Sequence, residues 1–465
     1  NGRFFEPNTG IWRLRTPVTL RYNADTAEIG AHDWSSDSGL VQISRARLGA
    51  DLELVAALTD LPLAMANPAL PAGMRLLGRA NAEINLTQRE DIWEGFIKWR
   101  QHGTALQIAQ TYTGTASVVI PRFEAEVNLL NSGGASVALS TNIDNGLSAN
   151  LQAEVDRLDR LAHINGNIKL TGAQWSWVPA LLPDLDEVKG TVTADLSISG
   201  PLTEPNLDGE LLWRDGHLML PALNIALQDI DLTVSGKPAA RMEVLAKARS
   251  GDGHLALAGS VEELMHSNRT VTLKLTGQKA EFINWPEYRA WMSPQLEVNG
   301  DANGWRIGGE LVVPRAEITV RELPEGAVKP SPDIRVLGAP KPETKTANYA
   351  ARVHVALGKE VHIQALGLDT HVAGRLLVTS SDSPTLSAQG QLALVDGVFK
   401  RFGQKLTIRK GTLTFAGPID NPLIDIEAVR EIDNLGRTIL AGIHIRGYQD
   451  DLTTSVFSEP AMSEA

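Results

Sequence analysis

Apolar and polar residues alternate along most of this chain. In the segment GTVTADLSIS, which begins at Gly190, four apolar side chains alternate with four polar ones. Because successive side chains of a strand point to opposite faces, this pattern predicts a strand with one apolar and one polar surface. The same alternation recurs in residues 82–86, 136–140, 270–276, 352–357, 392–395, 412–416, 423–428 and 439–446. The pattern therefore predicts an all-β chain.

Turns should be frequent and helices few. Clusters of Gly, Asn, Asp and Ser at 131–134, 144–146 and 250–253 are typical of hairpin turns. Residues 61–70 and 175–182 contain prolines that allow only short helices, and 156–161 and 285–292 could each form one or two turns. At roughly 11–13 residues per strand and turn, about 35–40 strands are expected.

Internal repeats indicate how these strands are organised. Leu70-Pro71 precedes Gly78 at the same spacing at which Leu182-Pro183 precedes Gly190, and the segment that begins at Gly200 resembles the one that begins at Gly417. Such repeats favour an elongated sheet that grows along one axis, whereas independent β-sandwiches would need clear boundaries. The one candidate boundary is the proline-rich segment 321–345, which we interpret as a long crossing loop or flap.

Composition narrows the function classes. Hydrophobic residues make up 43% but aromatics only 5%, so an apolar face must consist mainly of aliphatic side chains. The net charge of −12 argues against nucleic-acid binding, and the lack of cysteine excludes disulfides and thiolate chemistry. No apolar run reaches the ~18–20 residues that span a bilayer. We interpret the sequence as a fragment whose anchor or export signal lies outside it.

No catalytic or metal-binding motif is found. His354, His362 and His371 are spaced by eight and nine residues, and we interpret them as solvent-side strand residues. Asp425 and Glu427 alternate with isoleucines and should lie on the polar face. We therefore expect no enzyme activity, no catalytic residue, no metal and no cofactor, and a polysaccharide-acting enzyme is disfavoured because paired carboxylates and aromatic platforms are lacking.

Two local features have a structural and a functional interpretation. Trp175 and Trp177, with Val178 and Leu181, suggest a short helix that caps one repeat, in preference to a docking element. The most basic stretch is Phe399-Lys400-Arg401-Phe402 with Lys405, Arg409 and Lys410, which could contact lipid headgroups or form a solvated loop.

Three stretches resemble one family. They are residues 196–234 with the core LMLPALNI, residues 390–430 with GQLALVDGVF, GTLTF and NPLID, and the ending VFSEPAMSEA at 456–465. These resemble the C-terminal domain of the TamB family over residues 182–465, and the chain stops where the family continues. This divides the chain into an N-terminal β-repeat section, 1–181, and a TamB-type groove domain, 182–465, that includes 321–345 and lacks its C-terminal end.

The resemblance implies a fold and a function. TamB-like proteins are anchored in the inner membrane and cross the periplasm as a long β-structure. They work with TamA, an outer-membrane barrel protein, in autotransporter and outer-membrane protein assembly. They belong with AsmA-like proteins, whose hydrophobic grooves are thought to conduct phospholipid between the inner and outer membranes. The alternation alone leaves a closed sandwich and an open trough possible, and the resemblance favours the trough.

The expected partners are thus a TamA-like protein, phospholipid acyl chains and both membranes, with no nucleic acid. The alternative is a scaffold that pairs with client strands by β-augmentation without conducting lipid. If the trough is correct, the residues expected to line it are Val192, Ala194, Leu196, Ile198, Leu207, Leu211, Leu392, Leu394, Leu413, Phe415, Ile424, Ile426, Ile439, Ala441, Ile443 and Ile445.

Overall fold

A computed structural model describes most of the chain. It covers residues 2–461 except 91, 111–113, 145, 238–240, 266–267, 321–348, 366, 382–385, 402, 435–436 and 450. The proline-rich segment 321–345, Phe402 and the last four residues of the family-like ending therefore lie outside the described residues.

The described residues form 29 strands and two short helices. The first half contains β1 (Arg3–Glu6), β2 (Gly10–Leu14), β3 (Leu20–Tyr22), β4 (Ala27–Ile29), β5 (His32–Ser36), β6 (Gly39–Leu48), β7 (Leu52–Pro62), η1 (Leu63–Ala69), β8 (Met74–Arg89), β9 (Ile92–Gln110), β10 (Gly114–Leu129), β11 (Ala135–Ile143), β12 (Leu147–Val155), β13 (His163–Gln174), α1 (Val178–Leu181), β14 (Asp186–Pro201) and β15 (Asn206–Leu220). The second half contains β16 (Ile225–Lys237), β17 (Arg241–Ser250), β18 (Gly253–Glu262), β19 (Thr270–Gln278), β20 (Ala280–Asn284), β21 (Tyr288–Asp301), β22 (Gly304–Val320), β23 (Tyr349–Ala365), β24 (Leu368–Ser381), β25 (Ser387–Arg401), β26 (Gln404–Pro418), β27 (Leu423–Asn434), β28 (Arg437–Tyr448) and β29 (Asp451–Glu459).

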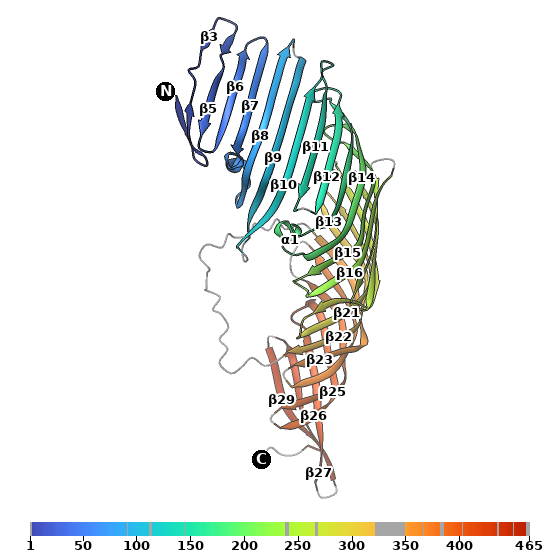
Figure 1. Cartoon of the computed structure of the whole chain (residues 1–465). Helices are drawn as coiled ribbons and strands as arrows, with labels where there is room; N and C mark the ends of the chain where they lie inside the picture. The colour runs from blue at the N-terminus through green and yellow to red at the C-terminus, as the bar shows by residue number, and fades with distance from the viewer. Residues whose placement is uncertain are drawn as a thin grey trace. The chain divides into compact units, whose positions relative to one another are not determined.

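All the strands belong to one sheet, which confirms the all-β prediction. Sequence neighbours pair as hairpins through much of the chain, and Figure 1 shows β5 to β14 side by side in chain order. The expected number of about 35–40 strands was too high for the described part of the chain. The strands are longer than expected, up to 19 residues in β9, because bulges lie within strands and do not end them.

One pairing differs from the rest. β22 and β23 are parallel, with Trp305 opposite Tyr349 and Val320 opposite Ala365, whereas the other pairings with a described register are antiparallel. The end of β22 and the start of β23 therefore lie at opposite ends of the paired strands. The repeated segments that begin at Gly200 and Gly417 are hairpin connections. One joins β14 to β15 and the other joins β26 to β27.

The chain divides into two units. Unit 1 contains residues 1–219, 230–243 and 263–266, and unit 2 contains residues 220–229, 244–262 and 267–465. Within unit 2, one buried apolar cluster is built from β22 to β26 and consists of Val313, Ala316, Val361, Val372, Leu376, Ala388, Leu392 and Phe415. All eight side chains come from neighbouring strands of the same sheet, so this core forms where the sheet curls on itself.

Glycines with positive φ bend strands within each unit. Gly209 of β15 lies opposite Leu196 with φ of +113°, and Gly309 of β22 lies opposite Leu296 with φ of +126°. A Cβ at either position would lie 2.2 Å from a backbone oxygen of the neighbouring strand. Only glycine tolerates both this backbone conformation and this approach, so these positions bend the ladder without breaking it.

The helix predictions were half correct. The segments 61–70 and 175–182 contain η1 and α1, and Gly78 and Gly190, which follow them at the same spacing, have nearly equal φ values of +115° and +118°. The prediction was wrong for 156–161, which forms bends and turns, and for 285–292, most of which belongs to β21. Residues 288–292 pair with neighbouring strands, and this pairing outweighs the local helix preference.

Candidate functional site

The sheet of unit 1 carries a continuous apolar row on one face. Cross-strand pairing joins the row from β8 to β15 through Ile84, Ile97, Val127, Val137, Ala153, Gly166, Ile198 and Leu207. Each of these residues lies directly opposite the next one, at the short distance at which cross-strand side chains contact each other. The alternation in the sequence therefore becomes a two-dimensional apolar surface.

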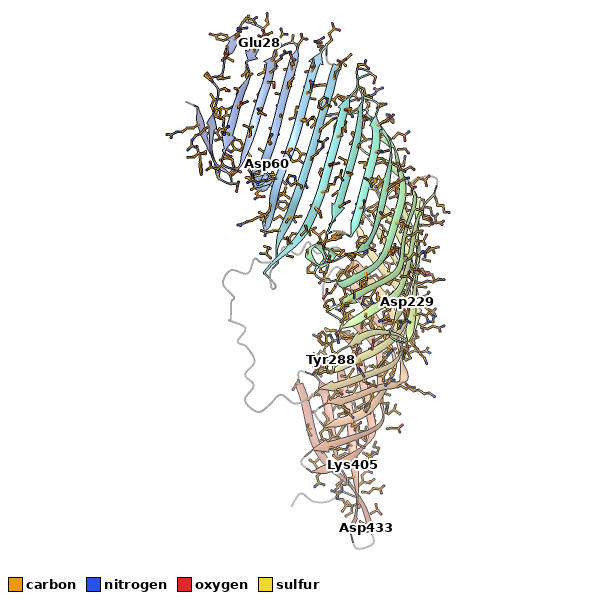
Figure 2. The ribbon with its side chains drawn as sticks, in the orientation of Figure 1. Glu28, Asp60, Asp229, Tyr288, Lys405 and Asp433 are labelled. Atoms are coloured by element: carbon orange, nitrogen blue, oxygen red, sulfur yellow. The ribbon has the colours of Figure 1, made fainter. Side chains whose placement is uncertain are left out.

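The opposite face of unit 1 is polar and carries paired charges. Lys98 lies 3.4 Å from Glu126, and Lys169 lies 3.8 Å from Asp195. Figure 2 shows side chains leaving the sheet on both sides of the ribbon. The two faces of unit 1 thus differ in chemistry along the same strands, one being apolar and the other polar.

The register places the sixteen predicted lining residues on the apolar face of their own unit. In unit 1, Leu196 lies opposite Ile168 and Gly209, and Ile198 lies opposite Leu207. In unit 2, Leu392 pairs with Leu413, which pairs with Ile424. Four of the sixteen are buried and the other twelve are half-buried. The side chains therefore share a face within each unit, while their contact with a lipid stays a prediction.

An open groove is present on the apolar face of unit 2. Its volume is about 690 Å³, and it lies over the last strands, β25 to β29. The lining is mostly aliphatic and consists of Phe399, Gln404, Leu406, Arg430, Ile432, Ala441, Gly442, Ile443, Ile445, Thr454 and Val456. We call this the C-terminal groove. It contains three predicted lining residues, Ala441, Ile443 and Ile445.

The other eight residues that line the C-terminal groove were not predicted from the sequence. An irregular point separates Phe399 from Leu394 in β25, and another separates Leu406 from Leu413 in β26. Counting by twos from Leu394 or Leu413 therefore does not reach them. Val456 is 79% exposed and lies opposite Ile443 on β29. The alternation of apolar and polar residues does not place β29 beside this groove, because only the register aligns it with β28.

The outer face of the same strands holds a network of charged side chains. Oδ1 of Asp425 lies 2.8 Å from Nε2 of His444, and Lys410 donates a 3.0 Å hydrogen bond to Oδ2 of Asp425. The hydrogen bond from His444, followed by that from Lys410, lowers the pKa of the Asp425 carboxyl below its usual value. Asp425 and Glu427 thus lie on the polar face, as predicted, and are occupied by ion pairs.

Arg409 joins three strands on this outer face. Its guanidinium donates hydrogen bonds of 3.0 Å to both Glu427 and Glu459, and it lies 5.4 Å from the centre of the Phe457 ring. These hydrogen bonds raise the pKa of Arg409 and lower that of the Glu459 carboxyl. Two of the cations that could have contacted lipid headgroups, Arg409 and Lys410, are therefore paired with carboxylates.

Two further cations of the basic stretch, Lys400 and Lys405, also face away from the groove. Lys400 and Lys405 lie opposite each other, one position out of phase with Phe399 and Leu406. Figure 2 shows Lys405 near the end of the β25–β26 hairpin. The side chain of Arg401 is outside the described part of the structure.

The short helix α1 caps strands of unit 1. Val178 and Ala180 are buried, and Nε1 of Trp175 donates a 2.8 Å hydrogen bond to the carbonyl of Gly190. The rings of Trp175 and Trp177 lie 5.9 Å apart. These contacts support the interpretation of this segment as a cap, with Leu181 left 45% exposed.

The histidine trio does not form a cluster with three ligands. His362 and His371 lie opposite each other with ring centres 4.9 Å apart, and Nε2 of His362 is 2.8 Å from Oδ1 of Asp369. His354 pairs instead with Leu377, further along the strand. Among the residues described, no group of three or more metal-ligating side chains is found, and no helix is long and apolar enough to cross a membrane.

Comparisons with known proteins agree with the sequence resemblance. The family model described as the TamB C-terminal domain matches residues 243–465, and the one described as the TamB N-terminal domain matches residues 1–212. The translocation and assembly module subunit TamB of Haemophilus influenzae is 25% identical over 365 residues, which is 75% of this chain and 28% of that protein. The likeness thus includes the first third, where only the alternation and one repeat were noticed.

Proposed function

The chain belongs to the TamB family, and we propose that its apolar sheet face carries phospholipid acyl chains across the periplasm between the inner and outer membranes. The relative's name links it to translocation and assembly, and this chain spans only 28% of that protein. The proposal therefore concerns the part of such a protein that this chain represents. Under this proposal, the chain catalyses no reaction, and transport of phospholipid depends only on the apolar sheet face.

One observation carries the proposal. The described strands form a single sheet, and most of the predicted lining residues on its apolar face remain only half-buried. In a closed sandwich, a second sheet would cover these side chains. A contiguous apolar surface that the protein does not cover is a typical binding surface for an apolar partner.

An acyl chain suits this surface better than a rigid ligand does. The row from Ile84 to Leu207 in unit 1 and the C-terminal groove in unit 2 are lined mainly by aliphatic side chains, with no recurring polar group to fix an orientation. Burial of one methylene group contributes about 0.8 kcal/mol, so ten methylenes held on such a face contribute about 8 kcal/mol before ordering costs. Because the contribution is similar at each step along an aliphatic row, a chain can slide with small barriers.

Photo-crosslinking from adjacent residues tests this proposal in the intact envelope. A photoreactive side chain is placed at Leu196 or Ser197 in β14, and at Val456 or Ser455 in β29, so that each pair samples opposite faces of one strand. We expect phospholipid adducts from Leu196 and Val456 and few from the serines. Asp425 is less suitable as an outer-face position because its replacement would break an ion pair with Lys410 and a hydrogen bond with His444. Equal adducts from both faces of each strand would refute a sided lipid path.

A second function is supported by β29. Among the described strands, β29 pairs with β28 alone, and most of its residues are exposed. An exposed strand edge can accept a further strand by β-augmentation. This supports a role in outer-membrane protein or autotransporter assembly with a TamA-like protein. Crosslinking from Leu452 to polypeptide instead of lipid would favour this function.

A further inference from the structure

Arg430 is placed unusually for a charged residue. It belongs to β27, where it lies opposite Ala441, two positions from Ala428 and from Ile432. On β26 to β29, the register assigns to the same face Gln404, Leu406, Ile424, Ile426, Ile439, Ile443, Ile445, Thr454 and Val456. Among the described side chains of these four strands, Arg430 is the only charged residue on this face.

The guanidinium has one polar partner in the groove. Arg430 donates a hydrogen bond from Nη1 to Oε1 of Gln404, which belongs to β26. A guanidinium has five N–H donors, so most of them remain available. Arg409, on the outer face, has its donors directed to two carboxylates. The two arginines therefore differ in that Arg430 has no described carboxylate within ion-pair distance.

The guanidinium donors that Gln404 does not occupy lie beside aliphatic side chains, so water or an anion must pair with them. Because the groove is open, Arg430 is hydrated when the groove is empty. An acyl chain that covers Ile432, Ile443 and Val456 would displace part of this water. An anion attached to the same acyl chain would replace the lost hydration with charge-assisted hydrogen bonds, and arginine binds phosphate oxygens in a bidentate manner.

We propose that Arg430, positioned by Gln404, binds the phosphate of a phospholipid whose acyl chains lie on Ile443, Ile445 and Val456. This proposal rests on the lipid-carrying function proposed above and adds a headgroup site to it. The ligand must combine an anion with an aliphatic tail, because the guanidinium and the aliphatic lining belong to one groove. The C-terminal groove would thus hold a phospholipid in one orientation and select against lipids without phosphate.

Binding measurements on the whole chain test the headgroup site. The ligands are dioleoylphosphatidylglycerol and dioleoylglycerol, which have the same acyl chains and differ in the phosphate-bearing headgroup, and glycerol 3-phosphate, which has no acyl chain. The variants are Arg430→Gln and, as a control, Arg446→Gln. Arg446 is exposed on the outer face of β28, so its replacement changes the net charge equally without touching the groove.

The expected results separate the headgroup site from the lipid path. Arg430→Gln should weaken binding of the phospholipid about tenfold or more, the effect of a lost charge-assisted hydrogen bond, and should leave dioleoylglycerol binding unchanged. Arg446→Gln should change neither. Circular dichroism should show both variants folded.

Four results would overturn the proposal in different ways. Equal loss in Arg430→Gln and Arg446→Gln would indicate attraction by net charge alone. Binding of glycerol 3-phosphate as tight as that of the phospholipid would indicate a phosphate site independent of acyl chains. Binding of both lipids with equal affinity to the unaltered chain would remove the headgroup site and leave the lipid path intact, whereas binding of neither lipid would also overturn the proposed function.

Discussion

Val456 offers a test of the groove that does not endanger the fold. It is 79% exposed on β29, lines the C-terminal groove and lies opposite Ile443. Substitution Val456→Asn keeps a side chain of similar size and places a neutral amide in the apolar lining. Ser455→Asn is the matched control, because Ser455 is also exposed and points to the outer face of the same strand.

The size of the effect follows from the chemistry of covering an amide. Without lipid, the amide at position 456 remains hydrated, so stability should change by about 0.5 kcal/mol or less, as for other surface substitutions. When an acyl chain covers it, the amide loses water and gains no partner, which costs about 1–3 kcal/mol. Lipid affinity should therefore fall about 5- to 150-fold in Val456→Asn.

The assay is equilibrium binding of dioleoylglycerol, which carries no charge and so does not involve Arg430. Thermal unfolding of both variants is followed by circular dichroism, to show that any lost binding is not lost structure. Ser455→Asn should bind as the unaltered chain does. If the two variants lose affinity equally, or if neither loses affinity, the groove is not where the acyl chain lies and the reasoning from its lining is wrong.

Two further predictions concern the backbone and pH. Gly209→Ala should lower the free energy of unfolding by about 1–3 kcal/mol or more, because alanine is strained at positive φ and its Cβ would meet Asp195. The control is Gly417→Ala, where a Cβ meets nothing within 4 Å. In the same denaturant titration, this control should lower the free energy of unfolding far less. The pKa of Asp425 is lower in the folded chain than its usual value of 3.8. The ionised carboxylate therefore stabilises the fold above pH 3.8, and this stabilisation is lost as pH falls through the lower folded pKa. In unfolding titrations at pH 7 and at pH 3, Asp425→Asn should therefore destabilise the chain more at pH 7.

Much of the fold could be predicted because alternation is a local property. The two faces of the segment around Leu196 can be assigned from the sequence of that one strand. The structure places its apolar side chains on one face, as expected. The number of strands and their pairing partners depend on non-local contacts. The bulges that lengthen β8 and β26, and the parallel pairing of β22 with β23, leave no mark in the alternation that distinguishes them from ordinary turns.

The site could be predicted only in part for the same reason. Ile443 and Ile445 were recognised because they alternate with polar residues within one strand. Arg430 was not recognised, because in the sequence it occurs beside Glu431 and near Asp433, in what looks like a polar strand end. Its position on the groove face emerges only when the register aligns it with Ala441 and when Gln404 is brought to it from β26.

The two faces of the last strands depend on each other. Val456 forms one wall of the C-terminal groove only while β29 remains paired with β28. On the outer face, Arg409 holds β29 through Glu459 and through the ring of Phe457, which belong to the family-like ending. An exposed ion pair contributes little alone, yet this one joins strands separated by fifty residues in sequence and adds the ring contact at the same point. Glu459 and Phe457 on the outer face therefore help to hold a wall of the C-terminal groove, although neither residue lines it. A sequence motif on the outer face can thus affect binding on the groove face.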